Sequence, residues 1–144
     1  MNRLKVIQKT NRSISCNENN KTLLFTCNGR MFCKIHLDSI QNNSISNSDL
    51  SCDYIIVSEE LKDIALWVEL KGNDAKHGLR QIGQSMQDFG KDITKKYAAI
   101  VCSKFHPQFD KYKREFIKRN KVPLFPKATK LQLRYNPSNQ TIST

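Results

Sequence analysis

The chain has 144 residues, with 24 Lys and Arg against 13 Asp and Glu, and its formal net charge is therefore +11. Its longest apolar run, residues 98–102, is far shorter than the roughly 20 residues that cross a bilayer. No apolar segment follows the N-terminal residues as it would in a secretory signal. Length and composition favour one domain over residues 1–135 and disfavour membrane and secreted classes.

The positive charge is concentrated in the last third of the chain. Residues 1–90 carry 11 cations and 10 acids, whereas residues 91–144 carry 13 cations and 3 acids. A basic surface attracts polyanions and gains entropy by releasing their counterions. We expect a nucleic-acid partner, with a solubilising face or an acidic lipid or protein partner as the alternative. The residues expected to contact nucleic acid are Lys104, Lys111, Lys113, Arg114, Lys118 and Arg119.

The five cysteines indicate a reducing compartment and hence a cytoplasmic location. Their number is odd and no C-x-x-C pair occurs, which disfavours a disulfide framework. Cys27, Cys33 and His36 could suggest zinc, but Cys33 and His36 lie three apart in a predicted strand and face opposite sides. We therefore expect most cysteines to be buried small hydrophobes and reject a zinc site.

In chain order, the first twenty residues are polar, with a weak apolar spacing that hints at a short helix. Residues 22–27 and 30–37 predict a hairpin, because Asn28-Gly29 suits the positive φ angles of a two-residue turn. Residues 39–50 are rich in Ser and Asn and predict a loop.

Two strands are then predicted over 52–58 and 64–71, followed by a helix over 75–95 that Asp74 caps. Apolar residues at steps of three and four give this helix one face that packs on a sheet; they are Leu79, Ile82, Met86, Phe89 and Ile93. Residues 97–103 predict a buried strand parallel to 64–71, which completes a βαβ unit. The remaining predictions are a basic helix over 107–119, strands over 121–125 and 130–135, and a disordered tail over 136–144.

A candidate active site is indicated by three residues, Asp53, Glu69 and Lys71. Side chains two apart on a strand share a face, so Glu69 and Lys71 point the same way. A hairpin that is symmetric about Leu61 places Asp53 opposite Glu69, with Cβ atoms about 4.5–5.5 Å apart. Two such carboxylates suit Mg²⁺, and Lys71 could orient a metal-bound water. The alternative is an edge-strand solubility feature in which Lys71 simply pairs with Glu69.

The segments Cys52-Asp-Tyr-Ile-Ile, Trp67-Val-Glu-Leu-Lys-Gly72 and Gln81-Ile82 resemble the PD-(D/E)xK, or restriction-endonuclease-like, nuclease superfamily. The resembling part covers roughly a third of the chain. It implies an α/β fold, a single domain with a central mixed β-sheet flanked by helices and an αβββαβ core. It also implies hydrolysis of phosphodiester bonds by in-line water attack, mostly in DNA.

The same resemblance implies roles for individual residues. Asp53, Glu69 and the Leu70 backbone carbonyl would hold Mg²⁺ or Mn²⁺, Lys71 would assist the attacking water, and Gln81 would lie near the metal. Two features depart from the family. Cys52 stands where many members have proline, and Glu18 is the only early candidate for the acid on the family's first helix.

The leading hypothesis is therefore a metal-dependent DNA endonuclease. The alternatives are a non-catalytic nucleic-acid-binding module that retains the nuclease fold, and a basic structural protein of a ribonucleoprotein. The presence of Asp53, Glu69 and Lys71 together favours the enzyme. His77 could serve as an acid or touch phosphate, or it could be a solvated helix residue. One such site cuts one strand, which is consistent with a homodimer.

Overall fold

The computed structural model describes residues 5–37, 52–71 and 73–144, so the predicted loop over 39–50 lies outside the described residues. These residues form ten strands and the helices α2 and α3. The elements are β1 (Val6–Thr10), β2 (Ser13–Glu18), β3 (Lys21–Thr26), β4 (Phe32–His36), β5 (Tyr54–Ser58), β6 (Ile64–Lys71), α2 (Ala75–Phe89), β7 (Lys95–Cys102), α3 (Phe109–Asn120), β8 (Leu124–Ala128), β9 (Lys130–Asn136) and β10 (Thr141–Ser143).

The larger sheet has the strand order β1-β4-β5-β6-β7-β8. The pairs β1–β4, β4–β5 and β5–β6 are antiparallel, whereas the pairs β6–β7 and β7–β8 are parallel. Parallel neighbours need a crossover, and α2 and α3 provide the two that join β6 to β7 and β7 to β8. The predicted mixed sheet and βαβ unit are confirmed, and β4, β5, β6, α2 and β7 give the βββαβ part of the expected core.

The second sheet, β10-β9-β3-β2, was not expected from the sequence. The predicted hairpin of β3 and β4 is wrong, because both edges of β3 are occupied by β2 and β9. Asn28 and Gly29 do have positive φ angles of 52° and 92°. Their turn carries the chain from one sheet to the other, and the Asn28 side-chain amide donates a hydrogen bond of 2.7 Å to the Tyr135 carbonyl.

Two predictions at the ends of the chain are also wrong. The described residues before β3 form β1 and β2 rather than a short helix, and Ile14 of β2 is fully buried. The predicted disordered tail over 136–144 contains β10, which pairs with β9 and buries Ile142. In both places a few apolar residues sit between polar ones, and packing between the sheets decides their conformation.

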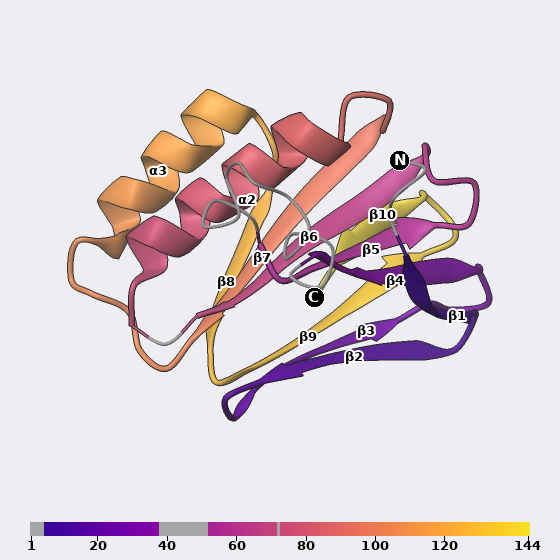
Figure 1. Ribbon diagram of the computed structural model, residues 1–144, viewed down its shortest axis with the longest axis horizontal. Helices are drawn as coiled ribbons and strands as arrows, with labels where there is room; N and C mark the ends of the chain where they lie inside the picture. The colour runs from indigo at the N-terminus through magenta and orange to yellow at the C-terminus, as the bar shows by residue number, and fades with distance from the viewer. Residues whose placement is uncertain (1–4, 38–51, 72) are drawn as a thin grey trace.

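The elements form three layers, with α2 and α3 on one face of the larger sheet and the smaller sheet on the other (Figure 1). Trp67 and Ile82 belong to the core between the helices and the sheet, while Phe25 and Val68 belong to the core between the two sheets. The structure is thus a single α/β domain that is mostly strand, and helices flank its central sheet on one face only.

Helix α2 begins as predicted, because Asp74 accepts a hydrogen bond of 3.0 Å from the backbone N–H of His77. It ends at Phe89 rather than at residue 95. Gly90 follows it, where an added Cβ would lie 2.6 Å from the Met86 carbonyl oxygen and 2.9 Å from the Trp67 ring. No helix among the described residues is long and apolar enough to cross a membrane.

Candidate metal site and basic groove

Asp53 and Glu69 meet where β5 begins and β6 ends. The observed register sets Tyr54 opposite Val68 and Ile55 opposite Trp67, which is the register that symmetry about Leu61 predicts. Extending it by one residue sets Asp53 opposite Glu69. Both side chains are buried, with 9% and 2% of their surface exposed. The predicted pair of adjacent carboxylates is therefore present, and we call it the carboxylate pair.

Two reciprocal hydrogen bonds hold the carboxylate pair. Glu69 Oε1 accepts from the backbone N–H of Asp53 at 3.1 Å, and Asp53 Oδ2 accepts from the backbone N–H of Leu70 at 2.9 Å. Backbone N–H donors stabilise the charged form of a carboxylate. Two adjacent buried carboxylates are stabilised by a nearby cation or by a shared proton.

Lys71 lies beside the carboxylate pair, on the face of the sheet that α2 covers. A Cβ added to Gly78 would lie 3.2 Å from Glu69 Cγ and 3.6 Å from Lys71 Cγ, so both stems lie beneath this glycine. Any larger residue at position 78 would also meet Ile100 Cδ1 at 2.9 Å. The glycine therefore allows the first turns of α2 to close over the site, and the predicted shared face of Glu69 and Lys71 is confirmed.

Two buried thiols flank Glu69 and respond to its charge. Burial, followed by the negative charge of Glu69, raises the pKa of Cys52 well above its usual range. Burial and then Glu69 likewise raise the pKa of Cys102 to about 11, while Lys21 and Lys71 oppose that rise. All five cysteines are free and buried. Protonated thiols of this kind are poor nucleophiles.

Gln81 lies on the flank of α2 that faces the start of β5. Ser85, one helical turn further along the same flank, accepts a hydrogen bond of 2.8 Å from the backbone N–H of Cys52. Gln81 is half-buried and its Oε1 is buried, as expected of a residue at the boundary of the helix. His77 is half-buried near the start of the same helix.

The residues present fit a hard divalent cation held by few protein ligands. Mg²⁺ commonly binds one or two carboxylates and completes its shell with water and substrate phosphate. Within the described ranges, no group of three or more His, Cys, Asp or Glu side chains is placed to hold a metal. Glu18, which ends β2 in the second sheet, thus does not join the carboxylate pair in such a group.

The six basic residues expected to contact nucleic acid lie on α3 and, for Lys104, in the segment before it. Lys118 and Arg119, at the end of α3, line a cavity between α2 and α3. Lys113 lines a smaller hollow of about 270 Å³ near the start of α3. Lys104, Lys111 and Arg114 are exposed away from both. Two of the six predicted residues thus line the cavity between the helices, and the other four lie outside its lining.

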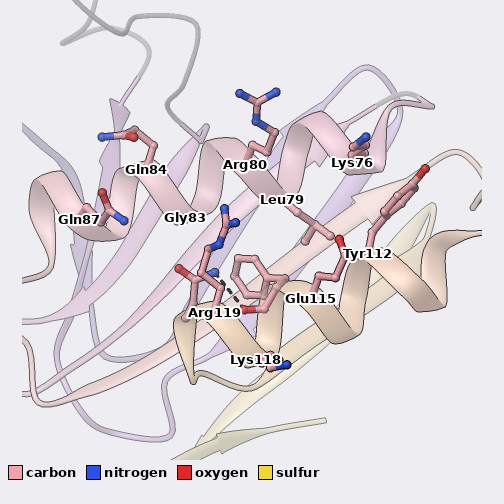
Figure 2. Close-up of a pocket in the computed structure, with 12 residues that line it drawn as sticks. Lys76, Leu79, Arg80, Gly83, Gln84, Gln87, Tyr112, Glu115, Lys118 and Arg119 are labelled. Atoms are coloured by element: carbon pink, nitrogen blue, oxygen red, sulfur yellow. Dashed lines mark hydrogen bonds between the residues drawn. The ribbon is translucent and has the colours of Figure 1, made fainter.

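The cavity between α2 and α3, the α2–α3 groove, has a volume of about 880 Å³ (Figure 2). Four cations line it, Lys76 and Arg80 from α2 and Lys118 and Arg119 from α3, against one acid, Glu115. The sequence predictions missed Lys76 and Arg80, which lie in the nearly neutral part of the chain. Their spacing of four residues, which places both on one face of a helix, was the signal that could have found them.

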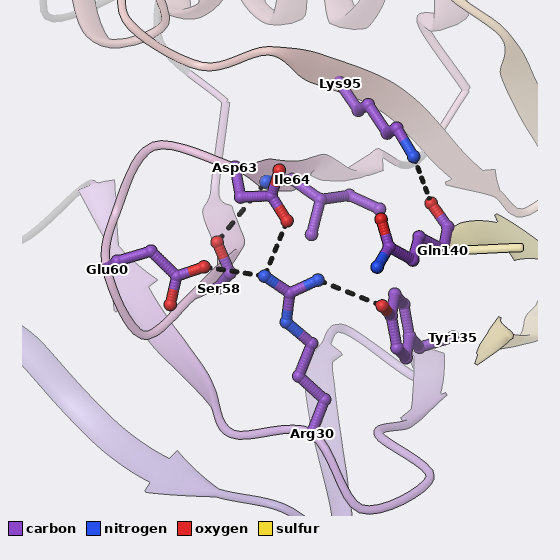
Figure 3. A network of polar contacts seen from close by, with 8 residues as sticks. All are labelled: Arg30, Ser58, Glu60, Asp63, Ile64, Lys95, Tyr135 and Gln140. Atoms are coloured by element: carbon purple, nitrogen blue, oxygen red, sulfur yellow. Dashed lines mark hydrogen bonds and ion pairs between the residues drawn. The ribbon is translucent and has the colours of Figure 1, made fainter. Parts of the chain in front are cut away.

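A second polar region lies around Arg30, where the guanidinium bridges several elements (Figure 3). Arg30 donates to Glu60 and to Asp63, both at 2.6 Å, and to the Tyr135 hydroxyl at 3.0 Å. Its carbon Cζ also lies 5.3 Å from the centre of the Tyr135 ring. These four residues, the Arg30 cluster, tie the turn between β5 and β6 to β9, which suits a structural role.

Comparison of the chain with protein-family models, curated proteins and solved structures gives no match. Function must therefore be inferred from the residues and their arrangement. The carboxylate pair with Lys71 and the α2–α3 groove are the two arrangements from which we infer it.

Proposed function

We propose that the chain is a divalent-metal-dependent nuclease that hydrolyses phosphodiester bonds, with DNA as the expected substrate. The observation that supports this most directly is the carboxylate pair beside Lys71 on one face of the sheet. The net charge of +11 supports a polyanionic substrate. An acidic pair that can hold a metal ion, together with cations that attract phosphate, suits phosphodiester hydrolysis.

Each residue of the site has a distinct role in this proposal. Asp53 and Glu69, with the Leu70 carbonyl, would hold Mg²⁺ or Mn²⁺. The bound ion would polarise the phosphate and lower the pKa of a coordinated water. Lys71 would orient that water and offset the negative charge that grows on the phosphate. Gln81, on the flank of α2, would lie near the metal ion and help to position the groups around it.

A second candidate is a nucleic-acid-binding module without catalysis. The reciprocal hydrogen bonds favour it, because they show that the carboxylate pair also completes the backbone pairing at the end of β5 and β6. Residues that hold two strand ends together have a structural reason to be present. The basic groove would then bind nucleic acid while the carboxylates served the fold.

A cleavage assay separates the two candidates. Purified protein is incubated with supercoiled plasmid, single-stranded DNA and RNA, in Mg²⁺, Mn²⁺ or EDTA. We expect metal-dependent cleavage of at least one substrate and, for Lys71→Met and Asp53→Asn, a loss of about 100-fold to 1000-fold in rate. Matched controls are Lys62→Met and Asp88→Asn, which change exposed residues outside the site and should retain wild-type rates.

The outcomes decide between the candidates. Intact substrates under every condition, with nucleic-acid binding retained, would overturn the nuclease proposal and leave the binding module. Cleavage that survives Lys71→Met and Asp53→Asn would show that the activity does not arise at this site. A Mn²⁺-induced rise in melting temperature that Asp53→Asn abolishes would support metal binding independently of turnover.

A further inference from the structure

We infer that the α2–α3 groove binds a single strand of nucleic acid and directs it toward the carboxylate pair. The inference deepens the proposed function and rests on it for the chemical class of the partner. It does not require catalysis, because binding in the groove is measurable without metal. The residues that carry it are Lys76, Arg80, Lys118 and Arg119, which line the groove from both helices.

The charges of the groove are the first argument. In the described part of the chain, no ion pair joins any of these four cations to an acid. Arg119 extends from α3 toward α2, and Lys76 and Arg80 stand one helical turn apart on α2 (Figure 2). Cations of like sign gathered along a groove raise the local concentration of anions and focus their approach. A chain of phosphates complements such a groove.

The groove has the length of a short stretch of single strand. Helices α2 and α3 pack against each other, so the groove runs along the surface where the two helices meet. Between Lys76 and Gln87 the groove runs for about 16 Å along α2, at 1.5 Å per residue, which accommodates several nucleotides.

The lining of the groove also suits bases. The half-buried Tyr112 presents its ring there, with Lys76 Nζ at 5.2 Å from the ring centre. Proteins that bind single strands combine a positively charged groove with aromatic rings on which bases stack. Gln84, Gln87 and Asn120 add amide groups that donate and accept hydrogen bonds. A purely solubilising surface has no need of this combination.

The groove begins at the part of α2 that covers the candidate metal site. Lys76 and Leu79 line the groove, while Gly78 between them packs on the side chains of Glu69 and Lys71. A strand that lies in the groove therefore passes the end of the helix under which the carboxylate pair lies. The same two turns of α2 serve the basic groove on one face and the acidic site on the other.

Fluorescence anisotropy with a labelled 20-nucleotide single-stranded DNA tests the inference, using the full chain in EDTA so that cleavage plays no part. Each phosphate contact contributes about 0.7 to the slope of log K against log salt for single strands. If Lys76→Gln/Arg80→Gln removes two contacts, the slope should fall by about 1.4 and the affinity at 0.1 M salt by about twentyfold. The control Lys62→Gln/Lys130→Gln removes the same charge from exposed positions outside the groove.

Three results would overturn the inference. The first is a groove variant that binds the single strand as tightly as its control does. The second is a hairpin duplex that binds as tightly as the single strand and is equally sensitive to the groove variant. The third is displacement of the DNA by polyglutamate of equal charge, which would identify a surface for acidic proteins. Absence of metal-dependent cleavage would overturn the proposed nuclease while leaving this binding result intact.

Discussion

The Arg30 cluster and the α2–α3 groove use cationic side chains in opposite ways. Arg30 lies between two acids and against an aromatic ring, so its charge is neutralised where it stands. The four cations of the groove share one acid, Glu115, and none of the ion pairs found in the described ranges includes them. Ion-paired charges fix loops, whereas gathered like charges without acidic partners repel each other. Our inference of a nucleic-acid partner for the groove rests on this difference.

Arg30→Met should give the largest loss of stability. It leaves Glu60 and Asp63 without their shared cation and removes three hydrogen bonds, and hydrogen bonds to charged groups contribute about 1.5–3 kcal/mol each. Because solvent screens the largely exposed acids, we expect the free energy of unfolding in urea to fall by only about 2–3 kcal/mol in total. Arg134→Met, at an exposed position of β9, is the control and should change it by less than about 0.5 kcal/mol. Equal losses of stability in Arg30→Met and Arg134→Met would show that the contacts of Arg30 do not stabilise the fold.

Two glycines of α2 allow the two regions to be compared by mutation, because Gly78 lies over the carboxylate pair and Gly83 lines the groove. Gly78→Ala forces a Cβ against Ile100 and Glu69, and overpacking of this kind costs about 1–3 kcal/mol. After the gain in helix propensity, we expect a net loss of about 1 kcal/mol in the free energy of unfolding, with weaker Mn²⁺ binding.

Gly83→Ala is the matched control, because its Cβ would meet Asn120 Oδ1 at an ordinary 3.4 Å. This variant should gain up to about 1 kcal/mol from helix propensity. Thermal melts of the two variants, with and without Mn²⁺, make the comparison. A stabilised Gly78→Ala variant with unchanged Mn²⁺ binding would show that close packing over the carboxylate pair is not required.

Acid should weaken the Arg30 cluster through Glu60. Partial burial raises the pKa of Glu60, but hydrogen bonds from its own backbone and from Arg30 outweigh this and hold the pKa below its usual 4.5. The ionised carboxylate therefore contributes stability above pH 4.5, and that contribution is lost as the pH falls through the lowered pKa. Because Glu60 is largely exposed, the loss should stay below about 1 kcal/mol.

Urea melts at pH 5.5 and pH 3.5 measure this loss. Glu60→Gln should remove part of the difference between the two pH values, whereas Glu115→Gln in the groove should leave the Arg30 contribution in place. The same pH dependence in wild type and Glu60→Gln would contradict a role for this carboxylate.

Removing one groove cation should produce the smallest effect, and in the opposite direction. Lys76 and Arg80 lie four residues apart on α2, and like charges at this spacing destabilise a helix by about 0.2–0.5 kcal/mol. Lys76 also contacts the Tyr112 ring, so the test uses Arg80. Arg80→Gln should therefore raise the free energy of unfolding by that amount in low salt, and the gain should disappear in 0.5 M NaCl through screening. Arg134→Gln, at an exposed position of β9, serves as the control. A loss of stability in Arg80→Gln would show that this cation has a structural partner.

Local signals predicted the central strands of the larger sheet well. The apolar strands β5, β6 and β7 and the spacing along α2 specify their own conformations, and a short charged turn fixes the β5–β6 register. The second sheet escaped prediction because Thr22 of β3 pairs with Lys130 of β9 across most of the chain. Only tertiary packing determines such a pairing, and Ile142 alone is too weak a signal for β10.

The candidate metal site was predictable from the sequence, whereas the groove was not. Register and strand periodicity bring Asp53, Glu69 and Lys71 together from sequence alone, because all three positions follow from one hairpin. The groove was not predictable from the charge of the last third of the chain, since half of its cations come from α2. The sequence does not reveal that Lys76 and Arg80 line a groove, because the groove forms only where α3 packs beside α2.

The hydrogen bonds of the carboxylate pair make two amide protons into reporters of the site. The backbone N–H of Asp53 donates to Glu69, and that of Leu70 donates to Asp53. An ion that binds these carboxylate oxygens therefore changes the shielding of both amide protons. In a nitrogen–proton correlation spectrum, a titration with Mg²⁺ should move these two resonances first. The occupancy of the site can thus be observed at two backbone positions, without substrate and without altering a single side chain.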